Sequence, residues 1–317
     1  MILPAFLELD AVAQIITRRQ FLTTVAGLAA TGAMLGGYAF AIEPYRLYFP
    51  RYRLTPANWP AGLKLKIAAI ADLHTCHPWM TAQRVRSIVH SVNAQKPDIV
   101  VLLGDFIATH RFVSEAEDKA AWTAALAELE APLGVHAVQG NHDWWESKEV
   151  QRKLAGPTPV ARALEAVGIP VYENKAVRIE KDGKAFWLAG LGDQWAFYRS
   201  RDLEKRWRSF GYEGVDDLEG TLAQVTDDAP VIMMAHEPDV FDRMPRRVSL
   251  TMSGYTHGGQ VQFMGIAPVV PSRFGRRYVY GHVQEAERDL IVSGGLGCSG
   301  LPIRFGRPPE VPIIELG

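Results

Sequence analysis

The sequence has 317 residues, 48% of them hydrophobic and 22% charged, which is the composition of an ordinary globular protein with a sizeable core. Its 34 lysines and arginines nearly balance 35 aspartates and glutamates, so the net charge is −1 and the chain lacks the basic field that nucleic-acid binding needs. We therefore expect no nucleic-acid partner. Two cysteines, Cys76 and Cys298, exclude a disulfide framework and a zinc finger, and leave open one bond between them in an exported protein.

The amino-terminal segment resembles a twin-arginine export signal. Residues 17–23 read Thr-Arg-Arg-Gln-Phe-Leu-Thr, residues 20–42 carry no charge, and Ala39-Phe40-Ala41 is a suitable cleavage site. At ~1.5 Å per residue the uncharged stretch spans about 33 Å, so residues 1–42 are expected to be a signal or a membrane anchor helix. A buried apolar helix behind a chance arginine pair is the competing interpretation.

The arginine pair also predicts the orientation of this segment. Arg18 and Arg19 precede the apolar stretch and favour a cytoplasmic amino end. The rest of the chain is then expected in the periplasm, or anchored in the cytoplasmic membrane and facing outward. Residues 43–62 contain several prolines and predict an irregular connector, so the globular domain is expected at residues 63–317.

The first half of this domain alternates between buried strands and amphipathic helices. Strands are expected at residues 67–71, 99–103 and 135–138, and helices at residues 81–93 and 114 to about 130. The second helix is expected to open with a capping box at Ser114-Glu115-Ala116-Glu117. This alternation is typical of a parallel sheet wrapped by helices.

The second half predicts a change of strand direction. Residues 177–180 and 185–189 flank the glycine-containing sequence Lys181-Asp182-Gly183-Lys184, which suits an antiparallel hairpin. Further strands are expected at residues 231–235, 248–253, 278–280, 290–293 and 311–316. The fold class is therefore α/β with a mixed arrangement of strands.

Polar residues follow five of the expected strands where each one ends. They are Asp72 and His74, Asp105, Asn141 and His142, His236, and His257. Taken singly, such residues are often structural, for example as helix caps or loop histidines. Together, at the edge of a sheet where ligands bind, they predict a metal centre. Carboxylate, imidazole and amide donors in this mixture are too rich in nitrogen for magnesium or calcium, and they are numerous enough for two ions.

These residues resemble the motifs of the calcineurin-like metallophosphoesterase family, namely Asp-x-His, Gly-Asp, Gly-Asn-His, a strand-end His and Gly-His-x-His. The resemblance covers residues 63–317 and implies central mixed β-sheets in a sandwich flanked by helices. It further implies a first metal ion on Asp72, His74 and His257, a bridging Asp105, a second ion on Asn141 and His236, and a leaving-group role for His142.

One position departs from the family pattern. Tyr255 stands where the first histidine of Gly-His-x-His is expected, and a neutral phenol with a reference pKa of about 10 is a poor ligand for a divalent ion. The second metal site is therefore expected to be weakened, with tyrosinate binding to a ferric ion as the alternative. Asp143 is expected either to orient a neighbouring group or to cap a helix, and Arg304 either to bind phosphate or to form a salt bridge.

The resemblance implies a metal-dependent phosphoesterase. Residues 253–260, 297–302 and 304–306 look like the membrane-associated or twin-arginine-exported branch, some of whose members cleave phosphodiester or diphosphate bonds, including those of lipid-linked nucleotides. We expect a monomer that uses two divalent ions of manganese, zinc or iron at the outer face of the cytoplasmic membrane. The alternative is a degenerate envelope protein that keeps one metal, binds a ligand and has no turnover.

Overall fold

The computed structural model describes residues 17–108, 110–199 and 211–317. The chain divides into two compact units, Met1–Tyr38 and Ala39–Gly317. Residues 1–16 of the expected signal or anchor lie outside the described part.

The described part of the first unit is an apolar helix. Helix α1 (Arg18–Ala41) is long and apolar enough to cross a membrane, and its side chains from Arg18 to Gly37 are exposed. Its length and apolar composition suit a signal or a membrane anchor. The last three residues of α1 belong to the second unit.

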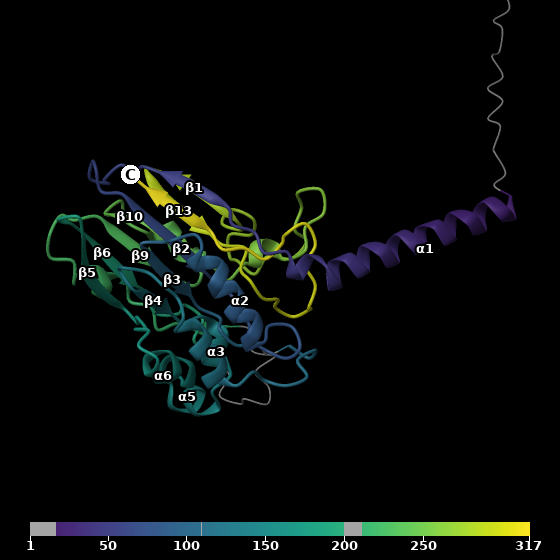
Figure 1. Ribbon diagram of the computed structural model, residues 1–317, viewed down its shortest axis with the longest axis horizontal. Coiled ribbons are helices and arrows are strands. Elements are labelled where there is room, and N and C mark those ends of the chain that lie inside the picture. Colours follow the sequence, from purple (N-terminus) through teal and green to yellow (C-terminus); the bar gives the residue numbers. More distant parts are fainter. Residues whose placement is uncertain (1–16, 109, 200–210) are drawn as a thin grey trace, which may run out of the picture. The chain divides into compact units, whose positions relative to one another are not determined.

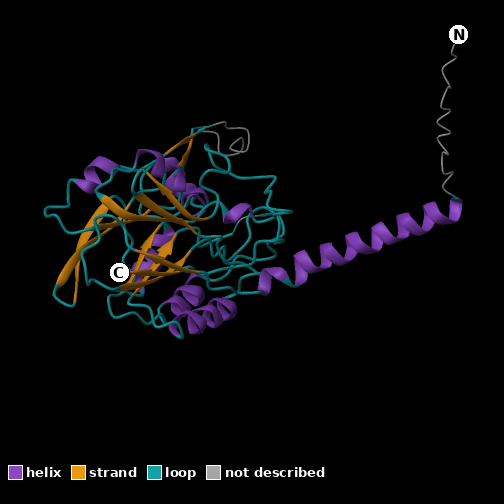
Figure 2. Cartoon of the chain, turned by 90° about the horizontal axis from the view of Figure 1, so that it is seen from above, coloured by secondary structure: helices purple, strands orange, loops and turns teal. Residues whose placement is uncertain are grey.

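Two β-sheets form the centre of the second unit (Figures 1 and 2). The five-stranded sheet has the order β1 (Arg51–Leu54), β13 (Ile313–Leu316), β2 (Leu65–Ile70), β3 (Ile99–Leu103) and β4 (Val135–Val138). The six-stranded sheet has the order β11 (Gly281–Glu285), β12 (Arg288–Val292), β10 (Val248–Ser253), β9 (Val231–Met234), β6 (Lys184–Gly190) and β5 (Lys175–Lys181). A short pair, β7 (Phe197–Tyr198) and β8 (Tyr212–Glu213), is antiparallel.

The strand directions confirm a mixed α/β fold. In the first sheet β2, β3 and β4 are parallel, and β13 is antiparallel to β2. In the second sheet β6, β9, β10 and β12 are parallel, and only the hairpins β5–β6 and β11–β12 are antiparallel. The sequence pattern located the β5–β6 hairpin, but the centre of the second sheet is parallel.

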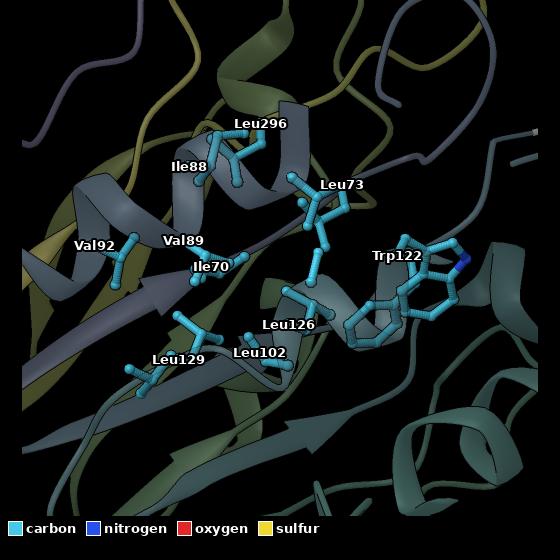
Figure 3. Packing of buried hydrophobic residues seen from close by; sticks show 14 of the residues in the cluster. Ile70, Leu73, Ile88, Val89, Val92, Leu102, Trp122, Leu126, Leu129 and Leu296 are labelled. Carbon is cyan, nitrogen blue, oxygen red and sulfur yellow. The ribbon is translucent and has the colours of Figure 1, made fainter. Parts of the chain in front are cut away.

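Apolar side chains pack in three layers that hold the sheets and helices together. Helices α2 (Ala82–Asn93), α3 (Lys119–Leu126) and α6 (Pro159–Ala166) supply apolar faces to the first sheet, as Figure 3 shows for Val89, Leu126 and Ile70. A second cluster joins the two sheets, for example through Ile67 and Met252. A third covers the other face of the six-stranded sheet with the 3-10 helix η3 (Pro238–Arg243). Burial on both faces explains why the central strands are continuous apolar runs.

The remaining helical segments are short. They are η1 (Glu43–Tyr45), α4 (Asn141–Trp145), α5 (Lys148–Lys153), α7 (Leu218–Leu222) and η4 (His257–Gly259). Of these, α4 and η4 begin at polar motifs that follow strands, so strand ends and helix starts coincide at one edge of each sheet.

Three expected elements differ from the structure. The predicted capping box at residues 114–117 is wrong, because α3 begins after Asp118, whose side chain accepts a hydrogen bond from Ala120 N–H. Residues 114–117 instead run beside His77, which bridges to Glu115 and forms an ion pair with Glu117. The expected strand at residues 278–280 is a turn, since Tyr278 packs its ring against Phe241 below the sheet. Strand β1 lies inside the expected connector, where pairing with β13 supplies its hydrogen bonds.

Candidate metal centre

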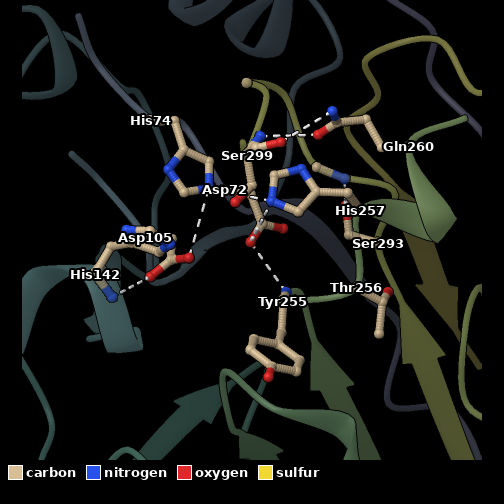
Figure 4. A network of polar contacts seen from close by, with 12 residues as sticks. Asp72, His74, Asp105, His142, Tyr255, Thr256, His257, Gln260, Ser293 and Ser299 are labelled. Carbon is tan, nitrogen blue, oxygen red and sulfur yellow. Dashed lines mark hydrogen bonds and ion pairs between the residues drawn. The ribbon is translucent and has the colours of Figure 1, made fainter. Parts of the chain in front are cut away.

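The carboxyl ends of strands from both sheets converge on one polar cluster, part of which is drawn in Figure 4. Strand β2 leads to Asp72 and His74, and β3 leads to Asp105. Strand β4 leads into α4 with Asn141 and His142, β9 leads to His236, and β10 leads to Tyr255 and His257. The six expected metal ligands are all buried. The fold therefore brings together residues from positions 72 to 257 of the chain.

Tight turns point these side chains back toward the sheet edges. Asp72, His74, Asp105, Tyr255 and His257 all have φ between 48° and 70°, in the left-handed region that non-glycine residues rarely adopt. Backbone conformations of this kind cost of order 1–3 kcal/mol each and cluster at functional sites. Five of the thirteen described non-glycine residues with positive φ lie in this one cluster, as expected for a functional site.

Two glycines allow the strand ends to approach one another. A Cβ atom on Gly104 would lie 2.5 Å from the backbone nitrogen of Gly140. A Cβ atom on Gly140 would lie 2.4 Å from Oδ1 of Asp105. The glycines of the Gly-Asp and Gly-Asn-His motifs are therefore required by close contact of the backbones, which brings Asp105 and Asn141 together.

Asp72, His74 and His257 form the first group of donors. Nε2 of His74 lies 3.1 Å from Nε2 of His257, and the two imidazole rings stack with their centroids 5.0 Å apart. Nδ1 of His74 lies 3.1 Å from the carbonyl of Ile107, to which it donates a hydrogen bond, so the lone pair of this ring is on Nε2. Burial lowers the pKa of His74 to about 3, and the ring is a neutral donor. The three residues offer ligand atoms within 4.8 Å of one another.

Asp105, Asn141 and His236 form the second group. Nε2 of His236 lies 3.3 Å from Oδ2 of Asp105, and Oδ2 also lies 3.5 Å from Nε2 of His74. Asp105 thus faces both groups, as a bridging carboxylate would. Nδ1 of His236 donates to the carbonyl of Leu103 at 2.7 Å, which again leaves the lone pair on Nε2 when the ring is neutral.

Unsatisfied polar atoms test whether the cluster fits metal ions. Oδ2 of Asp72, Oδ1 of Asn141 and Nε2 of His236 are buried and have no hydrogen-bond partner among the described residues. Burial also raises the pKa of Asp72 to about 7, since nothing nearby compensates fully for the loss of water. Buried atoms of this kind are costly unless something binds them. Each belongs to a residue that the sequence pattern assigns to a metal, so the donor set fits two cations.

Asp143 fixes the backbone turn that carries Asp105. Its Oδ2 accepts hydrogen bonds from Asp105 N–H at 3.0 Å and Gly140 N–H at 2.9 Å, and its Oδ1 accepts from Phe106 N–H at 2.9 Å. The bond from Gly140 caps the start of α4, so the two expected roles, orienting a neighbour and capping a helix, are combined in one side chain.

His142 lies between the donor groups and a cavity. Its backbone N–H donates to Oδ1 of Asp105 at 2.9 Å, and its ring lies 5.0 Å from that of His74 and 5.2 Å from that of Trp145. The cavity has a volume of about 720 Å³ and is lined by His74, His110, Arg111, His142, Trp145 and residues 298–301. His142 is half-buried, so it reaches the donor groups and the cavity together.

Tyr255 contacts the centre through its backbone. Its N–H donates to Oδ1 of Asp72 at 3.0 Å, whereas Figure 4 shows the phenol oxygen directed away from Asp72 and Asp105. The ring lies 5.5 Å from that of His236 and 5.7 Å from that of Trp195. Burial and the neighbouring carboxylate of Glu237 raise the pKa of the phenol well above its usual range. Tyr255 is therefore a neutral phenol beside the second donor group.

Arg304 has a role that sequence reasoning missed. The side chain is fully buried and donates to the backbone carbonyls of Gly297, Gly294 and Arg307, while Nη2 lies 3.4 Å from Nδ1 of His257. Among the described residues Arg304 forms no salt bridge, and phosphate binding by this residue stays a prediction. The guanidinium instead fixes the loop beside His257, and no sequence signal distinguishes such an arginine from an exposed one.

Comparison with known proteins identifies relatives of the whole domain. The sequence profile of the calcineurin-like phosphoesterase family matches residues 65–285. The chain is 29% identical over 307 residues to a Bacillus subtilis (strain 168) protein named uncharacterized metallophosphoesterase YkuE, with coverage of 95% of this chain and 97% of the relative. It is also 29% identical to phosphodiesterase YaeI of Escherichia coli (strain K12), with coverage of 95% and 99%. A transmembrane protein with metallophosphoesterase domain from Bos taurus is 28% identical, with coverage of 83% of this chain and 54% of that protein.

Proposed function

The chain belongs to the calcineurin-like phosphoesterase family and is a phosphoester hydrolase, and we propose that it cleaves phosphodiester or diphosphate bonds with two divalent metal ions at the outer face of the cytoplasmic membrane. The observation that carries this proposal is a set of buried atoms that make no hydrogen bond among the described residues, namely Oδ2 of Asp72, Oδ1 of Asn141, and Nε2 of His236, which faces Oδ2 of Asp105 at 3.3 Å. A decayed site would lose several donors, whereas here every expected ligand except the one replaced by Tyr255 is present and buried.

The residues divide into two ligand sets that share one carboxylate. Asp72, His74 and His257 would hold the first ion, and Asn141 and His236 the second, with Asp105 shared between them. Ions bound there would supply positive charge for the phosphoryl oxygens and for activating a water molecule. We propose manganese, zinc or iron, because the donors are mainly imidazole nitrogen and carboxylate oxygen.

His142 would hold the proton that the leaving group needs. The departing alkoxide of an unactivated ester is strongly basic, so its release is slow unless a nearby acid protonates it. His142 borders the cavity, and its backbone bond to Asp105 fixes its position relative to the donors. Tyr255 would leave the second ion with one ligand fewer than the family pattern provides, and we propose a weaker second site that needs added metal.

The proposal also concerns location and organisation. Residues 1–42 would be a twin-arginine signal or retained anchor, residues 43–62 a connector and residues 63–317 the catalytic domain of a monomer. The apolar helix α1 and the arginine pair at its start support export with an outward-facing catalytic domain. The substrate would be a phosphoester with a lipid or nucleotide portion, and the printed name of the bovine relative supports a membrane setting.

Turnover and metal content of the purified full chain test this function. We expect up to two bound divalent ions and hydrolysis of bis(p-nitrophenyl) phosphate. Replacing His142 with alanine should keep the metals and lower the rate on alkyl phosphodiesters ~10²–10⁴-fold, with much less effect on the activated aryl ester.

Two results would contradict the proposal. Equal losses on both esters would reject the acid role of His142. One bound ion and no turnover after added manganese, zinc or iron would favour the alternative, a one-metal binding protein of the envelope.

A further inference from the structure

An uncharged and apolar loop follows the turn at His257 on the surface of the second unit. Residues 258–272 contain no charged side chain, and within them Phe263, Met264, Ile266 and Val269 are exposed. The exposed fraction reaches 86% for Met264 and 73% for Val269. A bridge between Phe263 and Ile266 shapes the tip. Soluble surfaces rarely expose so many apolar side chains in one short segment, and such a patch marks an interaction site.

Hydrogen bonds join this loop to the rim of the cavity. The side-chain amide of Gln260 donates to the carbonyls of Ser299 and Leu301, and its oxygen accepts from Ser299 N–H at 2.8 Å (Figure 4). Ser299 and Leu301 line the cavity that contains His142, and Leu301 is itself exposed. The apolar loop and the mouth of the cavity are thus parts of one connected surface.

The same surface lies where the chain enters the second unit. Phe305 N–H donates to the carbonyl of Gln260, Gln262 N–H donates to the carbonyl of Phe305, and the rings of Phe263 and Phe305 stack. The preceding residue, Arg304, donates its backbone N–H to the carbonyl of Ala39 at 2.9 Å. Ala39 is the first residue of this unit and continues directly into the apolar part of α1.

We propose that this surface is a bilayer-contact rim, consisting of Phe40, Phe263, Met264, Ile266, Val269 and Leu301, which dips into the outer leaflet and presents the cavity to phosphoesters of lipids. All six side chains are exposed. The inference rests on the proposed function and names its substrate class, a phosphoester whose apolar portion stays in the membrane. Apolar side chains at the rim would reach the boundary between headgroups and acyl chains, so the cavity would lie at the level of the phosphates.

Charge and continuity favour a bilayer over a protein partner. The uncharged loop is followed by the exposed residues Arg273 and Arg276, which suit anionic headgroups at the edge of an inserted segment. The chain itself provides a membrane-spanning candidate that leaves the body at Ala39, next to the rim. An anchor at that point holds the rim within reach of the membrane without any second protein.

A fluorescent probe on the loop tests the contact. In the full chain, Met264→Cys is labelled with an environment-sensitive dye and reconstituted into vesicles of phosphatidylethanolamine and phosphatidylglycerol. Cys76 and Cys298 are buried, so labelling selects the new thiol. Asp182→Cys is the matched control, because it lies in the exposed β5–β6 turn at the opposite end of β6 from the site.

The two positions should respond differently to the membrane. We expect a blue shift and quenching by spin-labelled lipids at position 264, and neither at position 182. Equal responses at the two positions would overturn the proposal. Self-association of the full chain that disappears in Met264→Glu would assign the surface to a second copy and would also overturn it.

The substrate class is tested by one aryl phosphodiester presented in two ways. The double variant Met264→Glu, Val269→Glu should hydrolyse a diacylglycerol p-nitrophenyl phosphodiester in vesicles at least ~10-fold more slowly than the parent, and soluble bis(p-nitrophenyl) phosphate at an unchanged rate. Unchanged rates on both esters would reject the bilayer-contact rim while leaving the hydrolase intact. No turnover of either ester by the parent, with the dye at position 264 still quenched, would instead reject the proposed function and keep the rim.

Discussion

Replacement of Asp143 by asparagine tests how the hydrogen bonds of Asp143 hold the turn that carries Asp105. The two oxygens of Asp143 accept three backbone N–H bonds, two at Oδ2 and one at Oδ1. Asparagine has nearly the same shape but offers one acceptor and one donor. Its best orientation keeps the bonds from Asp105 and Gly140 and turns the amide group against Phe106 N–H, which leaves a buried donor unpaired.

The cost of this change follows from the lost bond. An unsatisfied buried donor costs about 1–3 kcal/mol. Because roughly 2–4 °C of melting temperature correspond to 1 kcal/mol in domains of 150–250 residues, we expect a fall of about 4–8 °C for a loss of 2 kcal/mol. Loosening the turn that carries Asp105 should also weaken metal binding by ~10–100-fold, the usual effect of losing a group that orients a ligand.

Thermal unfolding and metal titration of the full chain measure the two effects separately. Asp98→Asn is a chemical control, because Oδ2 of Asp98 accepts Lys66 N–H at 2.8 Å where β2 and β3 begin, at the opposite edge of the sheet from the metal centre. Leu126→Ala is a stability control, since truncation of a buried leucine costs about 2–5 kcal/mol without contact with the site. Both controls should keep the parent's manganese requirement. An Asp143→Asn variant with the parent's melting temperature and metal requirement would refute this account.

Three further predictions concern the metal centre and its location. Tyr255→Phe should bind metal like the parent, because the phenol is neutral and turned away. Tyr255→His should need less manganese for half-maximal activity. A coloured parent protein that loses its colour in Tyr255→Phe would instead establish tyrosinate ligation. Burial raises the pKa of Asp72 to about 7, and its proton must leave before a cation binds. Release of this one proton should make metal affinity fall by up to ~tenfold per pH unit below that value, and equal affinities at about pH 5.5 and 7.5 would contradict this. Lysine at both Arg18 and Arg19 should leave an active enzyme inside the cytoplasm, and its appearance outside, measured by fractionation, would indicate another export route.

Strand ends were the predictable part of this fold. The runs before Asp72, Asp105 and His236 are buried on both faces, so they are uniformly apolar and their ends are abrupt in the sequence. Polar residues of the cluster follow each run, which is why order and spacing placed seven of them at one edge, whereas the family resemblance supplied the choice of six as ligands. The roles of these residues in metal binding stay predictions.

Features that depend on contacts between distant residues could not be predicted. Strand β1 has four residues and an unremarkable sequence, and it exists because β13 offers a free edge. The segment just before α3 pairs with His77, which is far away in the chain, and the helix starts only at its cap Asp118. Arg304 is buried because three backbone carbonyls of one loop accept its hydrogen bonds. The direction in which backbone carbonyls point cannot be inferred from residue types.

If the leader is a cleaved signal, the hydrogen bond between Arg304 and Ala39 would link its cleavage to folding of the second unit. Ala39-Phe40-Ala41 is the expected cleavage site, yet Ala39 is buried, Phe40 packs edge-on against Trp79 at 4.8 Å, and the segment is helical to Ala41. A signal peptidase needs an extended chain, whereas in the folded protein this segment is helical and Ala39 is buried, although Phe40 and Ala41 are exposed. Cleavage would have to precede docking of these residues, and a chain that folds first would keep its amino-terminal helix for the lifetime of the protein.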